Sequence, residues 1–299
     1  MHRGTVEPGT DLMLRGFLTA WSWRPDVLFV LIALGTAFAI GWWRLRNRGF
    51  RRARRWRALA YVAGLGAVGL ALISPVDRLA SLSFLVHMVQ HELLIMVAPP
   101  LLLLADPLPV LLWGLPRKLR LAVRHLLARG AIVRRILYGA TWMPVAWGVY
   151  VFNLWMWHLP VAYEAALRNH FLHDLEHLAF FGTATLFWWP IINPAPRLHG
   201  KVPYGFRIVY ILAAAFQSTA LGFAIAVTDR VLYAPYMVAP RLWDLTPLDD
   251  QAFGGAIMSE GGMMYLIPLL VLIAQWLNDE ERMTHLREAI ALSGRKAAR

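Results

Sequence analysis

The sequence predicts an all-α, polytopic membrane protein with seven transmembrane helices in a single domain that covers residues 1–299. Only 16% of the residues are charged, whereas about 25% is usual for a soluble domain. The apolar residues also fall in blocks close to the ~20 residues that a helix needs to cross a bilayer. Many of the 14 tryptophans stand at the ends of these blocks, as in the aromatic belts of a membrane interface.

Seven predicted spans follow one another along the chain. Their approximate bounds are 27–43, 58–74, 82–104, 137–157, 174–193, 206–228 and 252–277. The first span begins just after Pro25 and ends on a tryptophan pair, and the second carries alanines and glycines that let neighbouring helices approach closely. The third contains Pro99 and Pro100, which must break its hydrogen-bond ladder and kink it.

The basic residues lie mostly in the gaps between spans, with eight arginines between positions 44 and 57. The gaps after spans one, three and five and the C-terminal tail hold 23 Lys and Arg residues, and the segments on the opposite side hold 7. The positive-inside rule therefore predicts an outer N-terminus and an inner C-terminus. The same distribution accounts for the net charge of +12 without a nucleic-acid partner.

The third span carries two histidines, His87 and His91, within an otherwise apolar block. Ionisable groups inside a membrane span are costly, and their presence there indicates a functional site. Residues four apart lie on one face of a helix, so both imidazoles can reach a single metal ion. A buried pair held by hydrogen bonds is the structural alternative.

Three further histidines are predicted at the same depth on the outer side. His158 ends span four, and His173 and His177 lie four residues apart at the start of span five. His158 can instead belong to the aromatic belt, and His173 can be solvated at a helix start. Together the five histidines predict a metal site, because imidazole is a ligand for Cu, Zn, Fe and Ni. The chain has no cysteine, which excludes thiolate ligands and disulfides.

Several polar residues near these histidines have a less specific pattern. The side chains of Gln90, Glu92, Asp174 and Glu176 are expected to orient the histidines through hydrogen bonds. Asp249 and Asp250 can attract a cation or a partner, or they can cap a helix. Glu260 lies inside span seven and is a further ligand or proton-carrier candidate, and the pattern leaves its role open.

Three segments of the chain resemble the CtaG family of cytochrome c oxidase assembly factors. HMVQHELLIMVAPPLLLLADP resembles the HMxQHxLLMxxAPPLLxLGxP signature of that family. The segment from WHLPVAYEAAL to HDLEH is similar to its WHxPxxYxxAL and HxxEH elements, and DDQAFGGAIM is similar to DQxxxGxxM. The chain departs from the family at Ser259-Glu260-Gly261, where Trp and Pro-Gly are usual.

The resemblance implies a multi-pass protein of the bacterial plasma membrane that is not an enzyme. Its expected partners are subunits of cytochrome c oxidase and the lipid bilayer, and its expected ligand is copper. The metal-relevant residues would be His87, His91, His158, His173 and His177. The rival interpretations are a membrane di-metal oxidase or hydroxylase, which also uses paired histidines, a haem-binding membrane protein, and a transporter of copper or small solutes.

Overall fold

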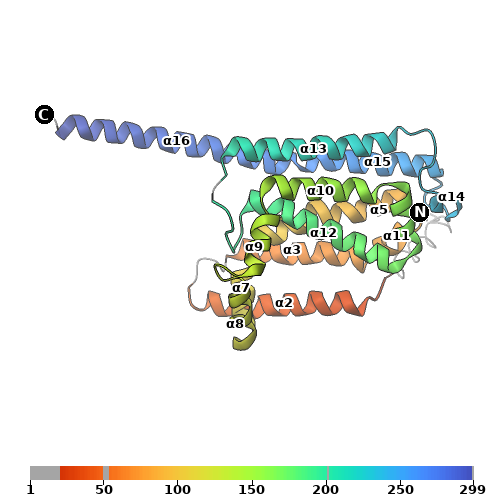
Figure 1. Ribbon diagram of the computed structural model, residues 1–299, viewed down its shortest axis with the longest axis horizontal. Helices are drawn as coiled ribbons and strands as arrows, with labels where there is room; N and C mark the ends of the chain where they lie inside the picture. Colours follow the sequence, from red (N-terminus) through yellow and green to blue (C-terminus); the bar gives the residue numbers. More distant parts are fainter. Residues whose placement is uncertain (1–20, 50–53, 201, 298–299) are drawn as a thin grey trace, which may run out of the picture.

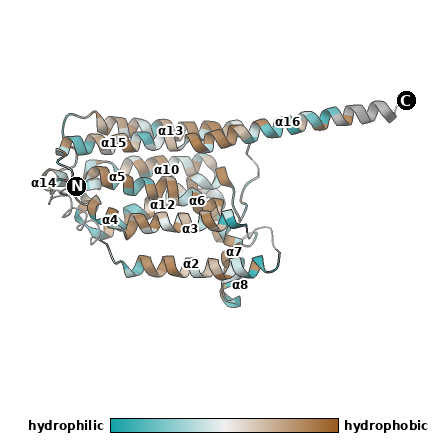
Figure 2. Ribbon diagram, turned by 180° about the vertical axis from the view of Figure 1, so that it is seen from behind, coloured by the Kyte–Doolittle hydropathy of each residue, from teal (hydrophilic) through white to brown (hydrophobic). Residues whose placement is uncertain are grey.

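The computed structural model describes residues 21–49, 54–200 and 202–297, and within these residues the chain is helical, with no strand. The long helices lie side by side in one bundle, and α16 (Leu266–Ala297) projects from it (Figure 1). Their central parts are predominantly hydrophobic, whereas the projecting part of α16 is mixed and more hydrophilic (Figure 2). The all-α prediction is therefore confirmed.

Each of the seven predicted spans corresponds to helical structure. Among the described residues, four segments are long and apolar enough to cross a membrane: Pro25–Arg46, Phe84–Leu104, Tyr204–Ala226 and Pro247–Glu288. The other three predicted spans correspond to α3 (Arg55–Leu72), α10 (Met143–Trp157) and α12 (His170–Ile192). The fourth span was predicted from residue 137, but α9 (Ile132–Ala140) is a separate helix there, and α10 begins beside Pro144, a residue suited to a first helical turn.

The bundle is held together by a helix pair at one edge and a central helix. Helix α13 (Tyr204–Ala226) packs along α15 (Pro247–Met264), and α15 also packs on α5 (Phe84–Glu92). A Cβ on Gly222 would lie 2.5 Å from the Ser259 nitrogen, so the backbones of α13 and α15 are in direct contact. Helix α12 packs against α10, α11 (Pro160–Arg168) and α6 (Ala98–Leu104), and α2 (Pro25–Arg46) lies at the opposite edge.

The predicted kink of the third span takes the form of a π-helix, η1 (Leu93–Val97), between α5 and α6. The carbonyl of Ile95 would accept from residue 99 in an α-helix and from residue 100 in a π-helix, but both are prolines without an N–H group. Trp188 of α12 donates its indole N–H to this carbonyl at 3.1 Å. The hydrogen bond that the prolines remove is thus replaced by one between two helices.

The two ends of the bundle differ in chemistry. One end holds α7 (Pro107–Gly114), the arginine-rich α8 (Arg117–Leu126) and α9. The other end holds α4 (Pro75–Ala80), α11, α14 (Pro235–Val238) and the first turns of α5 and α12. The part of the arginine-rich segment at residues 50–53 lies outside the described residues. The C-terminal tail continues α16 without a break as far as Ala297.

Replacing Trp188 with Phe tests the link between α12 and the π-helix. The Trp188→Phe variant leaves the Ile95 carbonyl without its donor, and we expect unfolding to become easier by about 0.5–1.5 kcal/mol. The matched control is Trp189→Phe, because the indole N–H of Trp189 is buried and has no partner among the described residues. Thermal unfolding in detergent measures both, and equal loss in the two variants would contradict the role of the hydrogen bond.

Candidate metal centre

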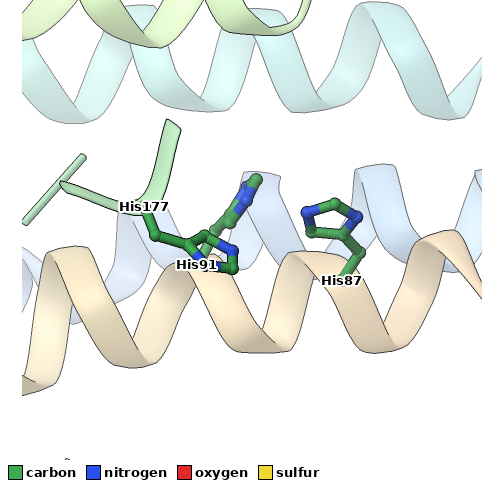
Figure 3. A group of neighbouring side chains, drawn as sticks. All are labelled: His87, His91 and His177. Atoms are coloured by element: carbon green, nitrogen blue, oxygen red, sulfur yellow. The ribbon is translucent and has the colours of Figure 1, made fainter. Parts of the chain in front are cut away.

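All five sequence-predicted histidines converge in the structure. His87, His91, His158 and His177 are buried, and His173 is half-buried. The imidazole centroids of His87 and His91 are 4.4 Å apart, and those of His173 and His177 are 4.2 Å apart. The two pairs face each other, with 5.6 Å between the rings of His91 and His177. Figure 3 shows the rings of His87, His91 and His177 gathered beside α5.

His158 completes the cluster from the C-terminal end of α10. Its ring centroid lies 6.0 Å from that of His91. The three helices that carry the histidines meet at the end of the bundle opposite the arginine-rich α8. The convergence expected from the spacing of the histidines is therefore present in the fold.

Glu176 lies within the cluster, although the sequence predicted only an orienting role for its side chain. Its side chain is fully buried, with one carboxylate oxygen 3.8 Å from His91 Nε2 and the other 4.0 Å from His87 Nε2. Neither oxygen has a hydrogen-bond partner among the described residues. The signal was present in the spacing, because Glu176 is three residues after His173 and shares its helix face.

Hydrogen bonds select the tautomer of His87. The hydroxyl of Tyr236 donates its single proton to the Ala80 carbonyl at 3.0 Å. It must then accept from its other neighbours, which are His87 Nδ1 at 2.9 Å and the hydroxyl of Tyr163 at 3.0 Å. His87 therefore carries its proton on Nδ1, and the lone pair of Nε2 is directed towards Glu176.

His158 is held in the same tautomer by a different partner. Its Nδ1 lies 2.7 Å from the Leu154 carbonyl, which can only accept, so Nδ1 is protonated and donates. The Nε2 of His158 is buried without a partner among the described residues. A backbone carbonyl or hydroxyl on the far ring nitrogen is the usual arrangement of a metal-binding histidine.

The donor set fits a metal ion. His87, His91 and His177 offer nitrogen atoms that all lie within 4.8 Å of one another, and His87, His173 and Glu176 offer a second such group. Both ring nitrogens of His91 and of His177 lack hydrogen-bond partners among the described residues. Because buried polar atoms are nearly always satisfied in folded proteins, one or two cations bound by these atoms would account for the cluster.

The first turn of α5, which carries the His87 pair, is fixed by a residue from α15. One oxygen of Asp250 accepts from the Ser83 hydroxyl at 2.6 Å, and the other accepts from the Phe84 backbone N–H at 2.7 Å. Asp249 instead forms a capping box with Thr246 at the start of α15. Of the two roles considered for this acidic pair, the structure shows helix capping.

The other polar residues considered from the sequence lie outside the cluster. Gln90 donates to the Ala71 carbonyl and to Asp77, and Glu92 packs against Gly261 of α15. Asp174 pairs with Arg24, whose pKa is raised by hydrogen bonds to Asp26 and to Asp174. This ion pair ties the segment before α2 to the second turn of α12.

Comparisons with known proteins gave matches that cover most of the chain. The family model described as cytochrome c oxidase caa3 assembly factor matches residues 36–279, which include every residue of the cluster. An uncharacterized protein of Mycobacterium leprae is 26% identical over 284 residues, covering 89% of this chain and 41% of that protein. Uncharacterized proteins of Mycobacterium bovis and Mycobacterium tuberculosis are 26% identical over 280 residues, covering 89% of this chain and 40% of each.

The chain thus spans about two fifths of the length of these curated relatives. No solved structure matches the chain significantly.

Removal of the Asp250 carboxylate is expected to destabilise the helix that carries the His87 pair. In Asp250→Ala, the Ser83 hydroxyl and the Phe84 N–H lose a buried acceptor, so we expect about 1–2 kcal/mol lower stability. Asp249→Ala is the control, because it removes an exposed cap of α15 and leaves α5 untouched. Hydrogen exchange of the α5 amides distinguishes the two. Equal exchange of α5 in both variants would show that Asp250 does not hold this helix.

Proposed function

The chain belongs to the family of cytochrome c oxidase caa3 assembly factors, and on this premise we propose that it aids copper delivery to the oxidase through its histidine cluster. The single observation that carries the proposal is the set of buried imidazole nitrogens and carboxylate oxygens that lack partners among the described residues. Copper is cargo in this proposal and is handed on to the client enzyme.

The donor set supports copper in two respects. Imidazole nitrogen binds copper ions well, and at a nitrogen-rich site copper binds more tightly than the other divalent metals of its row. Two overlapping groups that share His87 offer the ion more than one position within the cluster. Such overlap suits a site that must both accept and release an ion, because ligands can be exchanged one at a time.

The proposed setting is a bacterial plasma membrane, crossed seven times, with the N-terminus outside. The distribution of Lys and Arg in the sequence supports this orientation. The separation of the histidine cluster from α8 along the bundle is consistent with it. The cluster would then face the outer side, where a copper centre exposed on that side would be loaded.

A second candidate function is favoured by one observation, the carboxylate of Glu176 beside His87 and His91. Mixed histidine and carboxylate sets are typical of non-haem iron oxygenases, so a membrane di-metal oxidase or hydroxylase is the alternative. Iron in the purified protein together with oxygen consumption would favour that alternative. A Soret band in the absorbance spectrum would favour a haem protein instead.

Copper content tests the proposed site directly. Purified protein is expected to bind copper, and the His87→Ala/His91→Ala double variant is expected to lose it, because both groups of donors include His87. The control is His125→Ala, which changes an exposed histidine of α8. Equal copper in the double variant and the wild type would refute the assignment of these ligands.

The hydroxyl of Tyr236 is expected to tune the affinity for copper. Tyr236→Phe removes the acceptor that holds the proton of His87 on Nδ1, and loss of such a contact lowers metal affinity by about 10–100-fold. Tyr163→Phe is the matched control, because it removes a neighbouring hydroxyl that contacts Tyr236 and leaves the bond to His87 in place. Competition with a copper chelator measures both. Equal copper affinities in the two variants would contradict the assignment of the His87 proton to Nδ1.

A deletion strain tests the cellular role. We expect low cytochrome c oxidase activity without the protein, with partial recovery when copper is added to the medium. Complementation by the wild-type gene should restore activity, and complementation by Glu176→Gln should not if the carboxylate binds the ion. Unchanged oxidase activity in the deletion strain would overturn the proposed role.

A further inference from the structure

Glu260 stands apart from the histidine cluster. It lies on α15 with its side chain exposed on the outside of the bundle, and it makes no hydrogen bond or ion pair with any described residue. The segment that carries it, Pro247–Glu288, is one of the four that are long and apolar enough to cross a membrane. A carboxyl group therefore faces outwards from a predominantly apolar span.

The outward direction of Glu260 is set by the packing of the residues around it. On one side, Ser259 and Thr219 exchange hydrogen bonds, each hydroxyl donating to the other backbone carbonyl at 3.2 Å. Next to them, Gly261 and Gly262 lie against Glu92 and Thr219 with no room for a Cβ. Rotation of α15 about its axis would break these contacts. Glu260 therefore cannot be turned towards the interior.

Glu260 also lies well inside the predicted seventh span, residues 252–277. Glu260 is 8 residues from position 252 and 17 residues from Leu277, the two predicted ends of that span, which corresponds to about 12 and 25 Å at 1.5 Å per residue. A glutamate side chain is far shorter than either distance. An ionisable group at such depth is expected to face a partner.

The residues around Glu260 form an exposed stripe with the spacing of a helix-packing face. Successive members are three or four residues apart, which is the repeat of helices that pack side by side. The stripe runs from α15 past Tyr265 into the first turns of α16 and consists of Phe253, Ala256, Glu260, Met263, Ile267 and Leu270, all exposed. It is apolar except at Glu260, near its middle.

We propose that this stripe is the docking face for a transmembrane helix of another protein that carries a hydrogen-bond donor, a lysine or arginine side chain, at the depth of Glu260. The acidic group selects a cationic partner by charge complementarity, and polar contacts between membrane helices are directional enough to set their register. A second copy of this chain fits less well, because a two-fold axis through the stripe would bring two Glu260 carboxylates together. The inference goes beyond the copper role and does not depend on it.

A photo-crosslinker tests this docking face in native membranes. Benzoylphenylalanine at Met263 should yield one discrete crosslinked protein, whereas the same group at Ile32, an exposed position of α2, should not yield that product. The crosslinked peptide should come from a transmembrane helix that carries Lys or Arg. Glu260→Ala should lower the yield about 3–20-fold, and Glu280→Ala, which changes an exposed acidic residue in the hydrophilic part of α16, should not.

Charge exchange makes the test specific. Glu260→Lys should abolish the product, and replacing the partner's basic residue with Glu should restore it. The proposal is overturned by a product between two copies of this chain, by lipid adducts alone, by a partner helix without a basic residue, or by an undiminished yield in Glu260→Ala. Copper content of purified Glu260→Ala, expected to equal that of the wild type, reports separately on the histidine cluster.

Discussion

The structure depends on the confinement of five imidazoles and one carboxylate within an apolar helix bundle. Polar groups are costly to bury without partners, so each element that carries one must be fixed relative to the others. Asp250 anchors the first turn of α5, the Leu154 carbonyl orients His158, and Tyr236 orients His87. The contacts around the cluster leave at least one nitrogen of each ring buried without a partner among the described residues.

Sequence patterns predicted the helical segments and the convergence of the histidines, because both follow from local spacing. Apolar block length locates helices, and residues four apart must share a face. The contact between Tyr236 and His87 could not be predicted from local spacing, because Tyr236 comes from the short α14, 149 residues after His87. Glu176 was placed near the cluster but not within it, because its exact direction depends on how α12 is rotated against α5. The π-helix could not be predicted in this way either. The indole of Trp188, which replaces the missing hydrogen bond at Ile95, belongs to another helix.

Helix α15 links the centre of the molecule to its surface. Asp250 in its N-terminal turn fixes the helix that bears His87, and its glycines allow close packing on α13. Glu260 of the same helix faces outwards. The chain departs from the usual pattern of its family at this segment. Helix α15 packs tightly on two sides, and on the third it carries an acid without a partner among the described residues, the position of the proposed external contact.

The indole of Trp188 has a consequence for the binding of an ion. It joins α12 to the π-helix about one turn after His91 and about three turns after His177 along their helices. The helices that carry both histidine pairs are therefore fastened to each other, and their imidazoles keep a set separation. The conformational entropy of bringing the four rings of these pairs together is therefore lost when the protein folds, and an ion that binds as proposed would not have to supply it. An ion bound there, as proposed, would meet ligands at a set spacing, which would favour ions whose size and preferred geometry match it.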